Sequence, residues 1–272
     1  MSTVSAIEPI LFKVVFEVRY RFGYLYLDRC GRILNSILQD GAEWVIRAVP
    51  QPQAASVTSM RNSATFVYSS DSFSLSVEKA TGADGIADEE MVIFSEQADV
   101  LGSIVQSNLN VTDFKRIGLR VWYLFPCQNK PEAERWLMQL GLFEIPARVY
   151  EAFSGNLDSA SASILISTTD RKIRLAATSV ERSAVLDLGD TSMVVPPHTL
   201  SEKQDIVLRQ QLREKRRKQQ DPGHAVMIDI DSFIDDPGSE INISDFIRSS
   251  RTGLIERLRE AAATGPHRKR GE

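Results

Sequence analysis

The sequence is poor in cysteine and histidine, two residues that often carry catalysis or bind metals. Its 272 residues include only two cysteines, Cys30 and Cys127, and three histidines, His198, His224 and His267. Two cysteines without a Cys-x-x-Cys pair exclude a disulfide framework and a cysteine-based zinc site, and they fit a reducing compartment. The Gly-x-Gly-x-x-Gly, Gly-Lys-Ser/Thr, His-Glu-x-x-His and Gly-x-Ser-x-Gly motifs are also missing. We therefore expect no cofactor and favour a non-enzymatic protein over an enzyme.

Neither cysteine stands in the pattern of an activated nucleophile. Cys30 falls on the apolar stripe of a predicted helix, which favours a place in the core. Cys127 follows a predicted strand and precedes a helix start, where a thiolate is somewhat stabilised. His198 and His224 lie in or beside a charged segment, and the sequence offers no reason for either to reach Cys127. We therefore expect no catalytic Cys–His pair.

Long hydrophobic runs are missing as well. The most apolar stretch, near Val14, is interrupted by Lys13, Glu17 and Arg19, and it falls short of the ~20 residues that a membrane helix needs. The first residues, MSTVSAIEP, have neither the basic nor the apolar region of a signal peptide. A net charge of −4 does not favour binding of nucleic acid by bulk charge. We expect a cytoplasmic protein that has no membrane partner.

Strand patterns at a period of two are what the sequence does contain. Apolar and aromatic residues alternate with charged ones over residues 10–22, which predicts a half-buried strand. A helical pattern begins at Asp28 and ends near Gly41, a residue suited to a C-terminal cap. Further strands are predicted at 43–49, 54–59, 64–69, 72–77 and 91–94, and a helix is predicted after Ser95.

The same order of elements recurs in the second half of the chain. An alternating strand at 116–125 is followed by a helix from Asn129, and Pro131 stands where a first helical turn tolerates proline. Later strands are predicted at 163–168, 172–178, 184–188 and 225–233, and a last helix at 244–263. We therefore predict an α+β fold of two similar strand–helix–antiparallel-strands–helix units, residues 1–112 and 113–263, descended from an ancient duplication. One shared core and two separate cores both fit this pattern.

A charged insertion, residues 196–223, is predicted in the second unit, and a disordered tail is predicted at 264–272. The candidate partner- or nucleic-acid-binding residues are the basic ones of this insertion: Arg209, Arg213, Lys215, Arg216, Arg217 and Lys218. They could contact phosphates by charge alone, but no aromatic residues are interleaved to stack on bases. An acidic protein surface is the other partner that such a run suits.

The stretch VMIDIDSFIDD, residues 226–236, holds the candidate metal ligands Asp229 and Asp231. In a strand, both carboxylates project from one face, about 7 Å apart. Two ligands are fewer than a catalytic metal site usually has, and no glycine follows as a calcium loop requires. We therefore expect no bound metal and interpret the stretch as a half-exposed edge strand. Replacing its outward acids should then change stability little.

Three strand motifs, EPILFKVVFEVRY, RIGLRVWYL and MIDIDSF, stand in an order and spacing that resemble a known family. This family is a sporadically distributed, functionally uncharacterised bacterial one, whose cytoplasmic members are of about this length and begin with a Pro-Pro-then-Val-x-Phe-Glu-x-Arg strand. Here Pro9 stands alone, and Val121-Trp122 follows the GLR sequence where a polar residue is expected. The resemblance implies no catalytic residues. The patchy distribution implies horizontally moved genes, such as defence or toxin–antitoxin loci.

These observations together predict a protein-binding or regulatory subunit of a bacterial multi-protein system. Its partner would be another protein, and the sequence leaves the oligomeric state open. Two alternatives stay open beside this prediction. One is sequence-indifferent binding of nucleic acid through Arg213–Lys218, and the other is a metal-dependent phosphodiesterase centred on Asp229 and Asp231.

Overall fold

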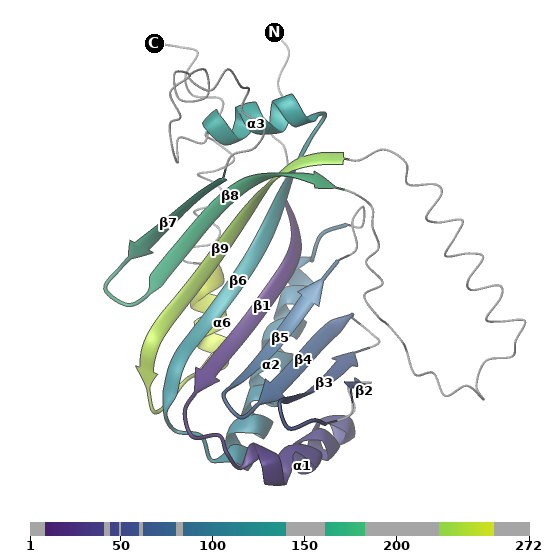
Figure 1. The fold of residues 1–272 in the computed structure, drawn as a ribbon, viewed down its shortest axis with the longest axis vertical. Coiled ribbons are helices and arrows are strands. Elements are labelled where there is room, and N and C mark those ends of the chain that lie inside the picture. Colours follow the sequence, from purple (N-terminus) through teal and green to yellow (C-terminus); the bar gives the residue numbers. More distant parts are fainter. Residues whose placement is uncertain are drawn as a thin grey trace, which may run out of the picture.

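The computed structural model describes residues 9–40, 44–48, 50–59, 62–79, 84–139, 161–182 and 223–252. Within these ranges the fold is α+β, as predicted: nine strands form one antiparallel sheet, and four helices accompany it (Figure 1). The strand order across the sheet is β2-β3-β4-β5-β1-β6-β9-β8-β7. None of the described helices combines the length and the apolar character needed to cross a bilayer.

The elements of the first half follow the chain as one strand, one helix, a four-stranded meander and a long helix. Their bounds are β1 Ile10–Tyr20, α1 Tyr26–Gln39, β2 Trp44–Ala48, β3 Ala54–Ser59, β4 Ala64–Ser69, β5 Ser72–Glu78 and α2 Asp88–Leu109. The second half has a similar order. Its bounds are β6 Phe114–Cys127, α3 Lys130–Gln139, β7 Ser161–Ser167, β8 Lys172–Arg182, β9 Gly223–Gly238 and α6 Ile243–Ser250.

One predicted strand is wrong, because residues 91–94 belong to α2. This helix begins at Asp88 with three acidic residues in its first turn, where the helix dipole favours negative charge. The Glu90 carboxylate accepts a hydrogen bond from the backbone N–H of Ala87, which stabilises the helix start. Met91 and Phe94 are buried at helical spacing, whereas Val92 between them is exposed. The predicted strand 184–188 and the tail 264–272 lie outside the described residues, and so does the end of the last predicted helix. The predicted insertion 196–223 also lies outside them except for its last residue, Gly223, which begins β9.

The first strands of the two halves, β1 and β6, pair at the centre of the sheet. They run antiparallel, with Phe16 opposite Leu119 and Val14 opposite Val121. The last strand of each half flanks its first strand, β5 beside β1 and β9 beside β6. The buried apolar residues of both halves therefore form one contiguous core rather than two.

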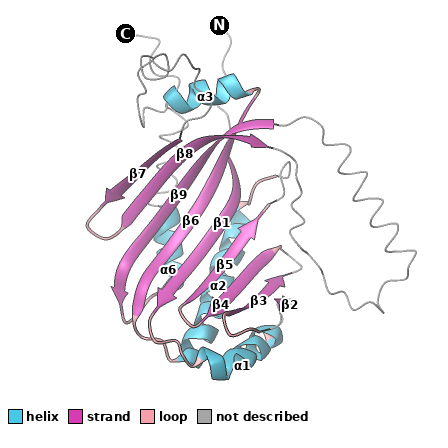
Figure 2. Cartoon of the chain, viewed as in Figure 1, coloured by secondary structure: helices cyan, strands magenta, loops and turns pink. Residues whose placement is uncertain are grey.

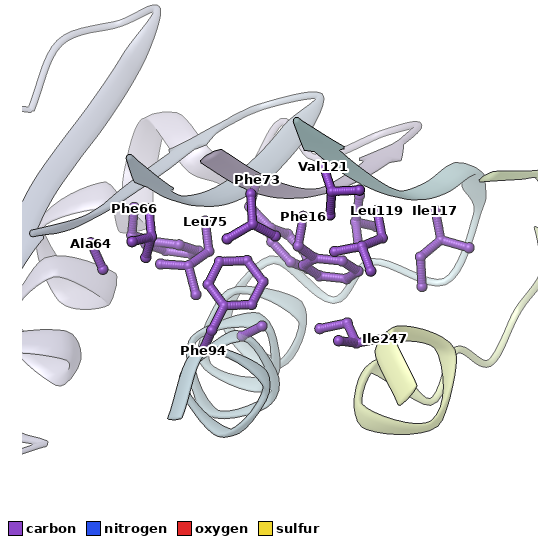
Figure 3. Close-up of a cluster of buried hydrophobic side chains, with 14 of the residues drawn as sticks. Phe16, Ala64, Phe66, Phe73, Leu75, Phe94, Ile117, Leu119, Val121 and Ile247 are labelled. Atoms are coloured by element: carbon purple, nitrogen blue, oxygen red, sulfur yellow. The ribbon is translucent and has the colours of Figure 1, made fainter. Parts of the chain in front are cut away.

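The core lies between the sheet and the helices α2 and α6. Figure 3 shows Phe94 of α2 and Ile247 of α6 directed at the apolar side chains of the central strands. The Phe16 ring lies 6.3 Å from the rings of both Phe73 and Phe246, a separation at which aromatic pairs attract. The alternating residues of the strands thus bury one side of the sheet, as their period of two predicts.

The other two helices cover the two ends of this same side of the sheet. Tyr26 of α1 packs edge-on against Tyr68 of β4, with ring centroids 5.9 Å apart. Trp136 of α3 packs against Phe125 of β6 at 4.6 Å. In Figure 2 the sheet accordingly lies in front of α2 and α6, and no described helix crosses its front.

Candidate functional site

The candidate site is the face of the sheet opposite the four helices, which we call the open face. Its central charged and aromatic side chains share the strand parity that points away from the core. They are Lys13, Glu17 and Arg19 of β1, Arg116, Arg120 and Trp122 of β6, Asp229, Asp231 and Phe233 of β9, and Lys172 and Arg174 of β8. Because directly paired residues of neighbouring strands lie on one face, the sheet register places these side chains side by side.

The most deeply buried ion pair of the open face joins Arg116 to Asp231. One guanidinium nitrogen of Arg116 donates to both carboxylate oxygens, at 2.9 and 2.8 Å. The Arg116 side chain is 18% exposed and that of Asp231 only 7%. The guanidinium also lies 4.5 Å from the Phe233 ring centroid, and its second nitrogen lies 3.6 Å from Glu17. Arg116 is therefore held by contacts on β1 and β9 at once.

A second pair, Arg120 with Asp229, lies beside the first. Arg120 donates from Nε to one oxygen of Asp229 at 2.8 Å and from Nη2 to the other, in the bidentate arrangement that arginine favours. The same guanidinium lies over the Trp122 ring at 4.5 Å, and the Lys13 ammonium lies 5.3 Å from that ring. The two cations hold Trp122 in a fixed environment through cation–π attraction.

The arrangement shifts the pKa of the Asp231 carboxyl. This carboxyl stands in a row across three strands, opposite Arg120 on β6 and Arg174 on β8. Burial raises the pKa of Asp231, while Arg116, Arg120 and Arg174 act in the opposite direction and the nearby Asp229 adds to the rise. Desolvation of the charged form is the largest of these effects, because so little of this side chain meets water.

The expectation that residues 226–236 form an edge strand with unpaired, outward acids is wrong. β9 lies inside the sheet, between β6 and β8. Asp229 and Asp231 do point away from the core, but arginines of β6 hold both carboxylates. Among the residues that the structure describes, no group of three or more histidine, cysteine, aspartate or glutamate side chains is arranged to hold a metal ion.

The half of the open face on β3, β4 and β5 has a different character. Most of its outward residues are small hydroxyl side chains, half-buried by their neighbours: Ser56, Thr58, Thr65, Ser74 and Ser76. Val67 of β4 lies among them, and Glu78 at the end of β5 pairs with Lys13 of β1. Thr58 and Thr65 are directly opposite one another, with hydroxyl oxygens 3.5 Å apart. The open face thus combines a charged half with a half made mostly of small hydroxyl side chains.

Cys127 and His224 lie closer together than the sequence suggested. They are directly opposite one another on β6 and β9, so their side chains share one face. However, the Cys127 thiol donates to the carbonyl oxygen of Phe125 at 3.5 Å. Burial raises the pKa of Cys127 and the Glu132 carboxylate raises it further, whereas a backbone hydrogen bond with Val226 lowers it. A raised pKa disfavours the thiolate that a nucleophile needs.

Sequence reasoning missed Arg116, Arg120 and Trp122 as site residues. The sequence did contain a sign of them, because they alternate with the apolar residues of this strand and so project from the opposite face. The basic candidates from Arg209 to Lys218 lie outside the described residues, so their role stays a prediction. Cys30, in contrast, packs against the core as expected.

No protein-family model matches the sequence, and no curated protein matches it significantly.

Proposed function

We propose that this chain is a non-enzymatic protein-binding or regulatory subunit and that its protein partner docks on the open face. The observation that carries this proposal is the ordered arginine, aspartate and tryptophan array on a sheet face that none of the described helices covers. Arginine and tryptophan are among the residues that contribute most to protein interfaces.

The array is held in place before any partner arrives. Arg116 and Arg120 are each fixed by a carboxylate and an aromatic ring. Side chains that are already ordered lose less conformational entropy on binding, so the same contacts give a higher affinity. The neighbouring half carries mostly small serine and threonine side chains, which a protein can approach closely.

The ion pairs of the open face favour a protein over a polyanion, and they include Lys13 with Glu78 and Lys172 with Asp235. Asp231 neutralises Arg116, and Asp229 neutralises Arg120. Nucleic acid binds through basic groups that are free to contact phosphates, whereas these guanidinium groups already contact carboxylates. Binding of nucleic acid through Arg213–Lys218 stays a separate prediction. The phosphodiesterase alternative loses support, because arginines occupy the carboxylate oxygens that a metal would require.

Membership of a bacterial multi-protein system, of the defence or toxin–antitoxin kind, rests on the resemblance of the three strand motifs. The ancient duplication has support of another kind. In both halves the first strand is central, the last strand flanks it, and the remaining strands extend outward. The antiparallel pairing of β1 with β6 is the relation that a two-fold axis between duplicated halves requires.

Affinity purification with quantitative mass spectrometry tests the proposed partner and its docking face. The open-face variant carries Arg19→Glu and Arg174→Glu, both at exposed positions. The matched control carries Arg32→Glu on α1 and Arg248→Glu on α6, two exposed arginines on the helix side. Both variants change the net charge equally.

We expect a stoichiometric protein partner whose recovery falls by about tenfold or more with the open-face variant and is unchanged with the control. Equal recovery with both variants would place the docking surface elsewhere. Equal loss with both would indicate attraction by overall charge rather than by this face.

A further inference from the structure

The two edge strands of the described sheet, β2 and β7, differ in how they are protected. An edge strand presents unpaired N–H and C=O groups, and proteins usually guard it with charge, shortness or a bulge. β2 spans five residues, includes Arg47, and shifts register against β3 between Ile46 and Ala48. It therefore has the features that discourage pairing with another chain.

β7 has none of these protections. Its seven residues, SASILIS, include no charge and no proline, and it pairs with β8 without a register shift. Leu165 is 56% exposed and Ile166 is 39% exposed. No described strand pairs with the outer edge of β7. An uncharged, regular and apolar edge of this kind is a template for an added strand.

The sequence of β7 indicates which strand fits there. Residues 163–167, Ser-Ile-Leu-Ile-Ser, read the same in both directions. If two copies paired antiparallel about Leu165, Ser163 would meet Ser167 of the second copy, Ile164 would meet Ile166, and Leu165 would meet Leu165. In a two-fold interface the same strand of both copies meets, so that residue i contacts residue j and residue j contacts residue i. Because residues 163–167 are palindromic, the side chains that meet in this pairing are also alike in size and polarity.

The two faces of β7 also suit this pairing. Ile164 and Ile166 stand opposite Leu175 and Ile173 of β8, on the side of the core, and Ile164 already packs against it. Pairing would place two further isoleucines beside them and continue the apolar layer into the second copy. On the open face the two exposed Leu165 side chains would cover each other, and serines would meet serines at the flanks.

We propose that two copies of this chain associate through β7, antiparallel, with Leu165 at the two-fold axis. The axis then stands perpendicular to the sheet, so both open faces lie on the same side of one continuous sheet. A dimer would present two docking faces to a partner and bind a two-site partner with greater avidity. Because one strand pair is a small interface, the association depends on concentration.

Disulfide trapping tests the register directly. Ser163→Cys and Ser167→Cys proteins, mixed at about 100 µM and oxidised mildly, should form a cross-linked heterodimer, because these two positions are directly opposite in the proposed pair. Neither protein alone should cross-link, because identical positions are then four residues out of register. A cross-linked homodimer of Ser163→Cys alone would overturn the proposed register, and no cross-link in the mixture would overturn the pairing itself.

Analytical ultracentrifugation gives a second, independent measurement. The wild type should shift from monomer to dimer with rising concentration, and Leu165→Lys should abolish that shift while leaving the melting transition intact. Ile46→Lys, at an exposed position of the β2 edge, is the matched control and should dimerise like the wild type. A wild type that stays monomeric at about 100 µM, or a Leu165→Lys variant that still dimerises, contradicts the proposal.

Discussion

Arg116 on β6 donates from a single nitrogen to both carboxylate oxygens of Asp231 on β9, across 115 positions of sequence. The pair is half-enclosed by Glu17 and Phe233 in the middle of a sheet face without a described helix. A buried charge without a partner destabilises the folded state. The same ion pair therefore stabilises the sheet and orders Arg116 on the candidate binding face.

Asp231→Ala should destabilise the protein by about 3 kcal/mol, because it leaves the largely buried Arg116 guanidinium without its main partner. This expectation replaces the small effect predicted from the sequence. Chemical denaturation followed by circular dichroism measures the change. Arg19→Ala, which removes an exposed ion pair with Glu17, is the control and should cost less than about 1 kcal/mol. Equal losses of stability in the two variants would mean that burial does not determine how much the Arg116–Asp231 ion pair contributes.

The pH dependence of stability should reveal the titration of Asp231. Burial raises its pKa in the folded protein above the unfolded value, so the folded state binds the proton more tightly. The stabilising contribution of this group to the free energy of unfolding is therefore fully present below its pKa in the unfolded chain. It is lost as pH rises through its pKa in the folded protein. Asp231→Asn removes this dependence while keeping the size of the side chain.

Denaturation of both proteins at several pH values above about pH 4 measures that contribution. The free energy of unfolding of the wild type, minus that of Asp231→Asn, should become smaller as pH rises. A difference that grows with pH would mean that Arg116, Arg120 and Arg174 outweigh burial and lower the pKa.

Two helical glycines should respond in opposite directions to alanine. A Cβ at Gly102 of α2 would lie 2.4 Å from Ile243 Cδ1 and 3.1 Å from Phe73 Cζ, so Gly102→Ala should destabilise by about 1–3 kcal/mol through overpacking. A Cβ at Gly31 of α1 would meet nothing within 4 Å, so Gly31→Ala should stabilise by about 0.5–1 kcal/mol. Thermal melting of both variants measures whether the melting temperature falls with Gly102→Ala and rises with Gly31→Ala. A Gly102→Ala protein as stable as the wild type would mean that the Ile243 side chain turns aside, or that α6 shifts, to make room for the Cβ.

Phe22 is an unusual residue for its backbone conformation. It has a φ of 61° and is 71% exposed, so it combines a left-handed backbone with little compensating burial. Asparagine tolerates this region better, and Phe22→Asn should therefore stabilise by about 1 kcal/mol. Tyr24→Asn is the control, since Tyr24 is 72% exposed and lies outside the left-handed region. A similar gain in both variants would attribute the effect to lost apolar exposure instead.

Local periodicity was enough to identify most strands of this protein and their buried sides. The alternation around Val14, Phe16 and Val18 predicted which side chains would be buried, and all three are. Alternation is a property of a few consecutive residues, and the physics that selects it, burial of every second side chain, acts on each strand separately. The run at residues 91–94 misled for the same reason, because a short apolar run does not by itself distinguish a strand from a helix.

Only the tertiary structure decided which strands are neighbours. Asp229 and Asp231 alternate with apolar residues whether β9 lies at an edge or inside the sheet. Their pattern therefore could not predict that two arginines of β6 bind them. The same holds for Cys127 and His224, which strand pairing places opposite one another. Strand order depends on the packing of the whole chain, on the crossovers between strands and on the shared core beneath α2 and α6. The sequence by itself therefore determined which side chains face away from the core, and the order of the strands determined which of them meet.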